Sequence, residues 1–217
     1  MKQILSPAAA AGMVSNGTSV MVGGFLNCGV PQALVEALLV AGVCDLTLIV
    51  NDCGWPDKGV GKLVAEKRIA RAIVSHVGLN PLVSEQVHDK TLELELVPQG
   101  TLAERIRAAG AGLGGVITPT GVGTPVAEGK QTLTINGRDY LLELPLLADV
   151  ALVKAWKADT TGNLVHRRSA RNVNPLMAMA ARLVIAEVEE IVPVGTIDPD
   201  HVHTPGVLVD YLVQSTQ

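Results

Sequence analysis

The chain has 217 residues, of which 48% are hydrophobic and 18% are charged, so it can bury a large core as a single domain over residues 1–217 and is not disordered. A net charge of −4 and only two Trp, two Tyr and one Phe argue against a nucleic-acid surface, because they provide neither phosphate attraction nor base stacking. The longest apolar runs are broken by charges well before the ~20 residues that a membrane span requires, so no membrane is expected.

Cysteine and histidine spacing argues against a metal site. Cys28, Cys44 and Cys53 are odd in number and form no CxxC pair. His201 and His203 form an HxH pair without a third ligand nearby, which is typical of solvated or capping histidines. No signal peptide is recognisable at the start of the chain. These patterns predict a cytoplasmic, reduced and metal-free protein.

Short apolar strands alternate with helices along most of the chain. Ser6 is a helix N-cap and Pro7 a first helical residue, while Pro31 and Gly42 bound a second helix. Strands are expected at 19–22, 46–50, 73–74, 92–97, 150–154 and 183–186, and helices at 7–15, 31–42, 102–109 and 174–182 and in a last segment from 207. The alternation indicates an α/β fold with a mainly parallel open sheet that helices cover on both faces.

One segment departs from this pattern. Between residues 131 and 144, polar and apolar residues alternate on either side of Asn136-Gly137, a dipeptide typical of a type I′ turn. The spacing therefore predicts an antiparallel β-hairpin inserted into the α/β fold.

Glycine-rich loops are the first candidates for a ligand site. Residues 110–115 satisfy GxGxxG, but the segment before them is helical and residues 117–121 after them cannot begin a helix, so the context excludes a dinucleotide fingerprint. Gly23 and Gly24 instead follow a strand and precede a helix, where open α/β sheets bind ligands. The alternative for these glycines is a tight connection without a ligand.

Two further loops follow predicted strands. The first, residues 98–101, contains Gln99, whose neutral amide could stabilise an oxyanion or could be a solvated turn side chain. The second, residues 118–125, is rich in threonine and glycine. Residues 84–86 (Ser-Glu-Gln) are interpreted as a polar connector, and Cys28 as a small space-filling residue without a paired base. No GxSxG elbow is present, which argues against an α/β-hydrolase.

Taken in order, these segments resemble family I coenzyme A transferases, on the α-subunit side, over nearly the whole chain. The matching residues are Asn16-Gly17, Val20-Met21-Val22-Gly23-Gly24-Phe25 with Gly29 and Pro31, residues 46–52, Val97-Pro98-Gln99-Gly100-Thr101-Leu102, Arg105-Ile106-Arg107-Ala108 with Gly110-Ala111-Gly112, residues 118–124, and Ser169-Ala170-Arg171-Asn172 with Asn174-Pro175. The similarity is greatest to the acetate/acetoacetate type of the family.

The resemblance implies a CoA-transferase-like fold and ping-pong exchange of CoA between a short-chain acyl-CoA and a free carboxylate or 3-oxoacid. In the family, the nucleophile is a glutamate in a Ser-Glu-Asn-Gly motif on the β half, which becomes a glutamyl-CoA thioester. This chain has Ser84-Glu85-Gln86-Val87 in a different place, so the glutamate is expected on a β subunit in an α2β2 assembly. CoA would be substrate and covalent carrier, with no tightly bound cofactor.

The resemblance also assigns roles to individual residues. Gln99 would donate to the oxyanion side of the reaction. The CoA-binding loop would consist of Gly23, Gly24, Phe25, Leu26, Asn27, Cys28 and Gly29, and the acyl pocket would be shaped by Pro98, Gly100, Thr118, Thr120, Gly121 and Gly123.

Two other functions remain open from the residues alone. A sugar-phosphate isomerase would need basic residues for the phosphate, and Lys67, Arg68 and Arg71 cluster suitably, but no carboxylate–lysine pair accompanies them. A non-catalytic scaffold subunit is the other alternative.

Overall fold

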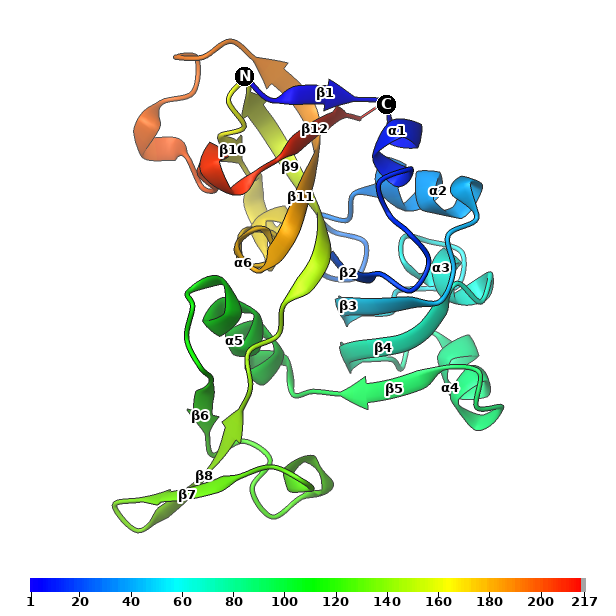
Figure 1. Cartoon of the computed structure of the whole chain (residues 1–217), viewed down its shortest axis with the longest axis vertical. Helices are drawn as coiled ribbons and strands as arrows, with labels where there is room; N and C mark the ends of the chain where they lie inside the picture. Colours follow the sequence, from blue (N-terminus) through cyan, green and yellow to red (C-terminus); the bar gives the residue numbers. More distant parts are fainter. Residues whose placement is uncertain (216–217) are drawn as a thin grey trace.

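Parallel strand pairing dominates the computed structural model, which describes residues 1–215 (Figure 1). Along the main sheet the order is β1-β12-β11-β9-β2-β3-β4-β5, every neighbouring pair is parallel, and β10 adds an antiparallel pairing to β9. The strands are β1 (Gln3–Leu5), β2 (Ser19–Val22), β3 (Leu46–Asp52), β4 (Ile69–His76), β5 (Glu93–Leu96), β9 (Ala148–Asp159), β10 (Leu164–Val165), β11 (Ala181–Val192) and β12 (Tyr211–Gln214). The predicted mainly parallel open sheet is confirmed.

Helices cover the two faces of this sheet and bury two separate apolar clusters. The helices are α1 (Pro7–Ala11), α2 (Gln32–Ala41), α3 (Gly61–Ala65), α4 (Pro81–His88), α5 (Gln99–Gly110) and α6 (Asn174–Met179). Residues of α1 to α4 belong to one cluster, and residues of α5 and α6 to the other. Figure 1 shows the same division, with α1 to α4 on one side of the strands and α5 and α6 on the other. The sheet is therefore buried on both faces, as its near-continuous apolar strands predict.

A second, antiparallel sheet projects from the main body (Figure 1). It consists of β6 (Val116–Thr118), β7 (Thr132–Ile135) and β8 (Arg138–Glu143) in the order β6-β8-β7. Asn136 and Gly137 have φ values of 51° and 75°, as a type I′ turn requires, so the predicted hairpin is confirmed and gains β6 as a third strand. Within this unit the buried Glu143 carboxylate pairs with Lys130 Nζ at 2.6 Å. Arg105 of α5 ties the projecting sheet to the body, because its Nε donates to the Leu144 carbonyl at 2.9 Å.

The strand order reverses direction at β2. From β2 the chain adds β3, β4 and β5 in succession toward one edge, whereas β9, β11 and β12 extend from the other side of β2. The connection after β2 carries α2 on one face, and the connection between β9 and β11 carries α6 on the other. The carboxyl end of β2 is therefore a topological switch point, where open α/β sheets form a ligand-binding crevice.

The structure corrects several sequence-based boundaries. The segment after 207 is a short 3-10 turn, Gly206–Leu208, followed by strand β12, because residues 211–214 are paired between β1 and β11. Residues 84–86 lie inside α4 instead of in a connector, and Gln86 is buried, with Nε2 donating to the Val64 carbonyl at 2.8 Å. Helix α1 ends at Ala11 and α6 at Met179, and β1 was not predicted. In residues 1–215 there is no helix of the length and apolarity needed to cross a membrane.

His166, just after β10, is a buried histidine that links strand β9 to the connection between β11 and β12. Its Nδ1 lies 2.9 Å from the Lys154 carbonyl oxygen and its Nε2 2.9 Å from Thr204 Oγ1. A carbonyl can only accept, so Nδ1 carries the proton and Nε2 accepts from the Thr204 hydroxyl. Burial, reinforced by His203 and Arg171, lowers the pKa of His166 to about 4, so the ring is neutral at pH 7.

We therefore expect acid to destabilise the fold through His166. His166 becomes protonated below about pH 6.5 in the unfolded chain, but only below about pH 4 in the folded chain. Because the unfolded state binds more protons between these two values, the free energy of unfolding falls as the pH is lowered from 6.5 to 4. The full contribution is about 3 kcal/mol at ~1.4 kcal/mol per pH unit. Urea unfolding at several pH values should show a smaller loss between pH 7 and 4 for His166→Gln than for the wild type. Equal losses in the two proteins would contradict this assignment.

Candidate active site at the carboxyl edge of the sheet

Residues 23–29 form a tight loop at the switch point, between β2 and α2. Gly23 N–H donates to the Leu152 carbonyl of β9 at 2.9 Å, and Phe25 and Cys28 exchange backbone hydrogen bonds of 3.0 and 2.9 Å. Between them Leu26 adopts a φ of 53°, a left-handed conformation uncommon for leucine. Phe25 is 50% exposed, and Asn27 and Cys28 are also exposed or half-buried, so the tip of the loop faces outward.

The glycines of this loop are required by the packing of the chain itself. A Cβ on Gly23 would lie 1.8 Å from Asn174 Oδ1, and a Cβ on Gly24, whose φ is 129°, would lie 2.5 Å from Val30 Cγ2. At Gly29, with a φ of 75°, the nearest atom would be the Ala170 carbonyl oxygen at 2.6 Å. The atoms nearest to each added Cβ belong to the protein, so the packing of the chain by itself accounts for these glycines.

Asn174, the first residue of α6, joins this loop to the β9 side of the switch point. Its buried side chain accepts from Lys154 N–H at 2.8 Å and donates to the Gly29 and Ala170 carbonyls at 3.0 and 2.9 Å. The nearby Asn172 donates to the Cys28 carbonyl at 3.0 Å. Residues 169–175 were part of the family-like pattern without a role, and the structure shows that their amides hold the loop.

The loop leaves few polar groups for a ligand. Within residues 1–215, the backbone N–H groups of Gly24, Asn27 and Gly29 have no acceptor, and the side chains at the tip are exposed. Burial and the Asp52 charge raise the pKa of Cys53 to about 12, so this thiol stays protonated at neutral pH. Cys28 Sγ lies 3.5 Å from Ser169 Oγ. The loop can therefore bind a ligand through its backbone donors.

A second group of predicted residues lines a cavity of about 480 Å³ between the start of α5 and β6. Pro98, Gly100, Thr118 and Thr120 contribute to it, together with Glu104. Gly121 and Gly123 lie on the adjoining turn, with φ values of 92° and 73°, and do not line it.

Gln99 is the first residue of α5, not part of a loop as the sequence indicated. No side chain caps this helix, so its first N–H groups are directed outward and give this end a partial positive charge. Gln99 is exposed and does not line the cavity, but its amide and the helix end both offer N–H donors to an anionic or carbonyl oxygen.

These two groups lie at the same edge of the sheet but not side by side. β2 and β5 are separated by β3 and β4, so their carboxyl ends are about 14 Å apart at ~4.8 Å per strand. A ligand that touches both must be long or must lie between two subunits.

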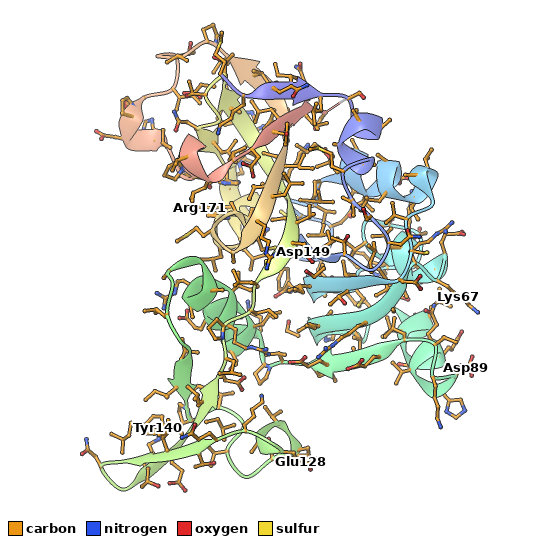
Figure 2. All side chains as sticks on the ribbon, viewed as in Figure 1. Lys67, Asp89, Glu128, Tyr140, Asp149 and Arg171 are labelled. Carbon is orange, nitrogen blue, oxygen red and sulfur yellow. The ribbon has the colours of Figure 1, made fainter. Side chains whose placement is uncertain are left out.

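The basic cluster considered for a sugar phosphate lies elsewhere. Lys67 and Arg68 precede β4 and are therefore at the amino edge of the sheet (Figure 2). Arg71 pairs with Glu93 and Glu95, and Arg68 donates to the Gly42 carbonyl. The cluster stabilises local structure and is remote from the carboxyl edge.

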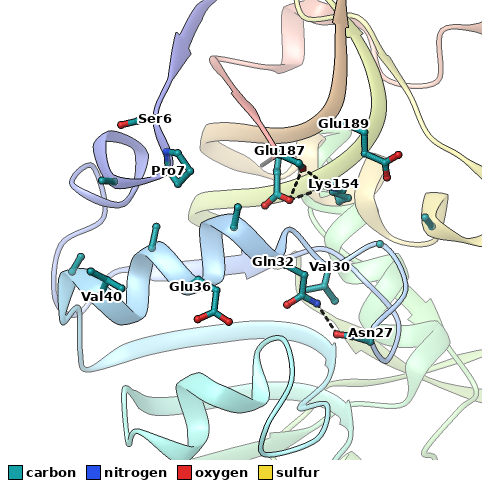
Figure 3. Close-up of a pocket in the computed structure, with 17 residues that line it drawn as sticks. Ser6, Pro7, Asn27, Val30, Gln32, Glu36, Val40, Lys154, Glu187 and Glu189 are labelled. Carbon is teal, nitrogen blue, oxygen red and sulfur yellow. Dashed lines mark hydrogen bonds and ion pairs between the residues drawn. The ribbon is translucent and has the colours of Figure 1, made fainter. Parts of the chain in front are cut away.

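A larger cavity of about 990 Å³ borders the outer side of the 23–29 loop (Figure 3). Asn27 and Gly29 contribute to its wall, together with apolar residues of α1 and α2. On its floor, Lys154 Nζ lies 2.9 Å from Glu187 Oε1, and Ser215 Oγ donates to the same oxygen at 2.8 Å. Sequence analysis missed this cluster, although a lysine and a glutamate within apolar β9 and β11 were a visible signal.

Comparison with known proteins agrees with this architecture. A family model described as coenzyme A transferase matches residues 4–215. The chain is 52% identical to one of the subunits of the probable succinyl-CoA:3-ketoacid coenzyme A transferase of Bacillus subtilis, over 98% of this chain and 89% of that one. It is 50% identical to the alpha subunit of the acetate CoA-transferase of Escherichia coli, over 96% of this chain and 94% of that one.

The fold is shared with the crystal structure of the acyl-CoA transferase YdiF from Escherichia coli O157:H7. The TM-score is 0.88 at 23% identity, over 99% of this chain and 47% of that one, so this chain spans about half the length of YdiF.

The fold is that of a CoA-transferase-like α/β subunit. The chain belongs to the coenzyme A transferase family, of which it is an α-type chain, as the ordered motifs predicted. Both of these relatives are named as one subunit of an enzyme.

The crowding at Gly23 predicts a stability defect. Gly23→Ala forces its methyl group against Asn174, and we expect the free energy of unfolding to fall by about 1–3 kcal/mol. Gly100→Ala is the matched control, because a Cβ there meets nothing within 4 Å and the helix gains alanine propensity. Urea unfolding should separate the two variants, and equal stability would show that Asn174 does not restrict the loop.

Proposed function

We propose that this chain is the α subunit of a short-chain acyl-CoA:carboxylate CoA-transferase of the acetate/acetoacetate type. The observation that carries the proposal is that this chain provides N–H donors at the carboxyl edge of the sheet, while the carboxylates next to those donors are already engaged. Among residues 1–215, the 23–29 loop and the wall of the cavity beside α5 provide N–H donors, while the carboxylate bonded to the loop and the one that lines that cavity are both engaged within the chain. Asp52 accepts three hydrogen bonds, and Glu104 pairs with Arg107. The named substrates of its relatives, acetate and 3-ketoacids, support the choice of acids.

As the family resemblance implies, the nucleophile is a glutamate carboxylate of the β subunit. Its oxygen attacks the thioester carbonyl carbon, the C–S bond breaks, and CoA leaves as a thiolate with an acyl–glutamyl anhydride left behind. The thiolate then attacks the glutamyl carbonyl and releases the first carboxylate, which gives a glutamyl-CoA thioester. The incoming acid repeats these two steps in reverse and leaves as the new acyl-CoA. No proton is gained or lost overall.

The α subunit binds the acyl-CoA and polarises its thioester carbonyl. Residues 23–29 contact the pantetheine arm, through the N–H groups of Gly24, Asn27 and Gly29, which have no acceptor within residues 1–215. Pro98, Gly100, Thr118 and Thr120 shape the acyl pocket, with Gly121 and Gly123 on its flanking turn. Gln99 and the exposed start of α5 stabilise the oxyanion. The ~14 Å between the two regions suits a substrate with a long arm held between subunits.

The assembly is proposed to be α2β2 and cytoplasmic, in keeping with three free thiols in the described chain. CoA is both substrate and covalent carrier, and no tightly bound cofactor is needed for the steps above.

Mixing the subunits tests the proposal. We expect the isolated chain to show no CoA transfer between acetoacetate and acetyl-CoA, and activity to appear on addition of a β subunit that carries the glutamate. Full turnover by the isolated chain would contradict the proposal that the nucleophilic glutamate lies on the β subunit. A scaffold-only role is tested by variants of this chain in the assembled enzyme, because a scaffold predicts that changes at its exposed edge leave kcat unaffected.

Gln99→Ala is the most informative of those variants. If the amide donates to the oxyanion, kcat and kcat/KM should fall together by about 100-fold with KM nearly unchanged, since the interaction exists only in the transition state. Steady-state kinetics with acyl-CoA and acid varied separately measures this, and Thr134→Ala on the projecting sheet serves as a surface control. A rise in KM for the acid with kcat unchanged would move Gln99 from catalysis to the acyl pocket.

A further inference from the structure

Asp52, the last residue of β3, is a buried carboxylate held entirely by neutral donors. It is 5% exposed. Its Oδ2 accepts from Leu26 N–H at 2.8 Å and from Asn51 Nδ2 at 3.1 Å, and its Oδ1 accepts from Gly54 N–H at 3.0 Å. Within residues 1–215, none of the ion pairs involves Asp52.

Burial of a carboxylate without an ion pair is unfavourable for the free energy of folding. A buried charge without a counterion loses its hydration, and neutral hydrogen bonds recover only part of that loss. The positions of the three donors show which segments the carboxylate holds together. Two belong to the backbones of separate loops, one after β2 and one after β3, and both donors are on residues with left-handed backbones, Leu26 at a φ of 53° and Gly54 at 57°.

The bond to Leu26 also decides which backbone groups of the 23–29 loop face a ligand. With Leu26 N–H directed inward to Asp52, and with Phe25 and Cys28 paired to each other, the remaining donors are Gly24, Asn27 and Gly29. Release of Leu26 would allow its backbone to leave the left-handed region, which would reorient the peptide groups on both sides.

We propose that Asp52 is a positioning residue, whose carboxylate sets the backbone of residues 23–29 in the conformation that binds acyl-CoA. This inference rests on the proposed function of the loop. Asp52 does not touch the substrate. It acts through Leu26, and an amide cannot replace it, because one carbonyl oxygen cannot accept from donors on both sides of the side chain.

The test compares Asp52→Asn with Asp149→Asn in the assembled α–β enzyme. Asp149, at the amino edge of β9, also has a carboxylate that accepts from a backbone N–H, that of Ser19 at 3.1 Å, and from the Ser19 hydroxyl (Figure 2). Both variants thus lose the charge of a hydrogen-bonded carboxylate, but only one lies beside the loop. For Asp52→Asn we expect KM for acyl-CoA to rise about 10-fold, with kcat and KM for the acid within twofold of wild type, and for Asp149→Asn we expect no change in any of the three.

Hydrogen exchange provides the second measurement, and it needs no activity. In the wild-type enzyme the amides of Leu26 and Gly54 should exchange at least 10-fold more slowly than those of Gly24, Asn27 and Gly29. In Asp52→Asn the Leu26 or Gly54 amide should lose that protection, while thermal unfolding shows that the rest of the chain is folded. If Asp52→Asn fails to fold, the wild-type exchange pattern and the kinetics of Asp52→Glu, which keeps two acceptors, decide the question. For Asp52→Glu we expect KM for acyl-CoA to rise by less than the about 10-fold expected for Asp52→Asn, with kcat unchanged.

The outcomes separate the inference from the function on which it rests. Unprotected Leu26 in the wild type, or an unchanged KM for acyl-CoA in folded Asp52→Asn, overturns the inference while CoA transfer by the wild type stands. A wild-type pair that transfers no CoA overturns the proposed function, and the exchange pattern then still reports whether Asp52 holds the loop.

Discussion

The pairing of β9 with both β2 and β11 is the constraint on which the rest of the structure depends. A twelve-residue strand in the middle of a parallel sheet cannot shift register without moving every apolar side chain to the wrong face. It also places residues 23–29 against residues 169–174, although some 145 positions separate them in the chain. Asn174 depends on this placement, because its partners come from β9, from the loop and from its own approach segment.

Buried polar groups have a consistent role around this pairing. Asn174, Asp52 and Glu187 are almost fully buried, and each has its oxygens satisfied by named donors, Glu187 through Lys154, Ser215 and the Leu34 N–H. Since unsatisfied buried polar groups are costly, such complete networks hold segments in one arrangement instead of many. Asn174 and Asp52 fix the inner side of the 23–29 loop, whereas its tip keeps exposed side chains and backbone N–H groups that have no acceptor within residues 1–215.

Two donor regions at the carboxyl edge are built differently. The 23–29 loop offers backbone N–H groups, whereas the start of α5 offers a helix end of partial positive charge beside a cavity. Asp52, which is bonded to the loop, and Glu104, which lines the cavity, are both engaged within the chain. This arrangement fits the proposed function, in which the nucleophilic carboxylate comes from another chain. The β6-β8-β7 sheet projects from the main body near α5 (Figure 1).

The sequence by itself determined the α/β class, the strands rich in β-branched residues, the type I′ turn at Asn136-Gly137 and the ordered motifs of the coenzyme A transferase family, because these depend on local patterns. It also located the loop after β2, since a strand, two glycines and a helix follow one another directly. Only the tertiary structure decided that residues 211–214 form a strand, because pairing with β1 and β11 overrides local propensity. The tertiary structure also showed that Gly23 must be glycine and that Asn174 and Asp52 hold the 23–29 loop. It placed Gln99 at the start of a helix. Sequence patterns could not show these features, because they depend on atoms distant in the chain that meet at the carboxyl edge of the sheet.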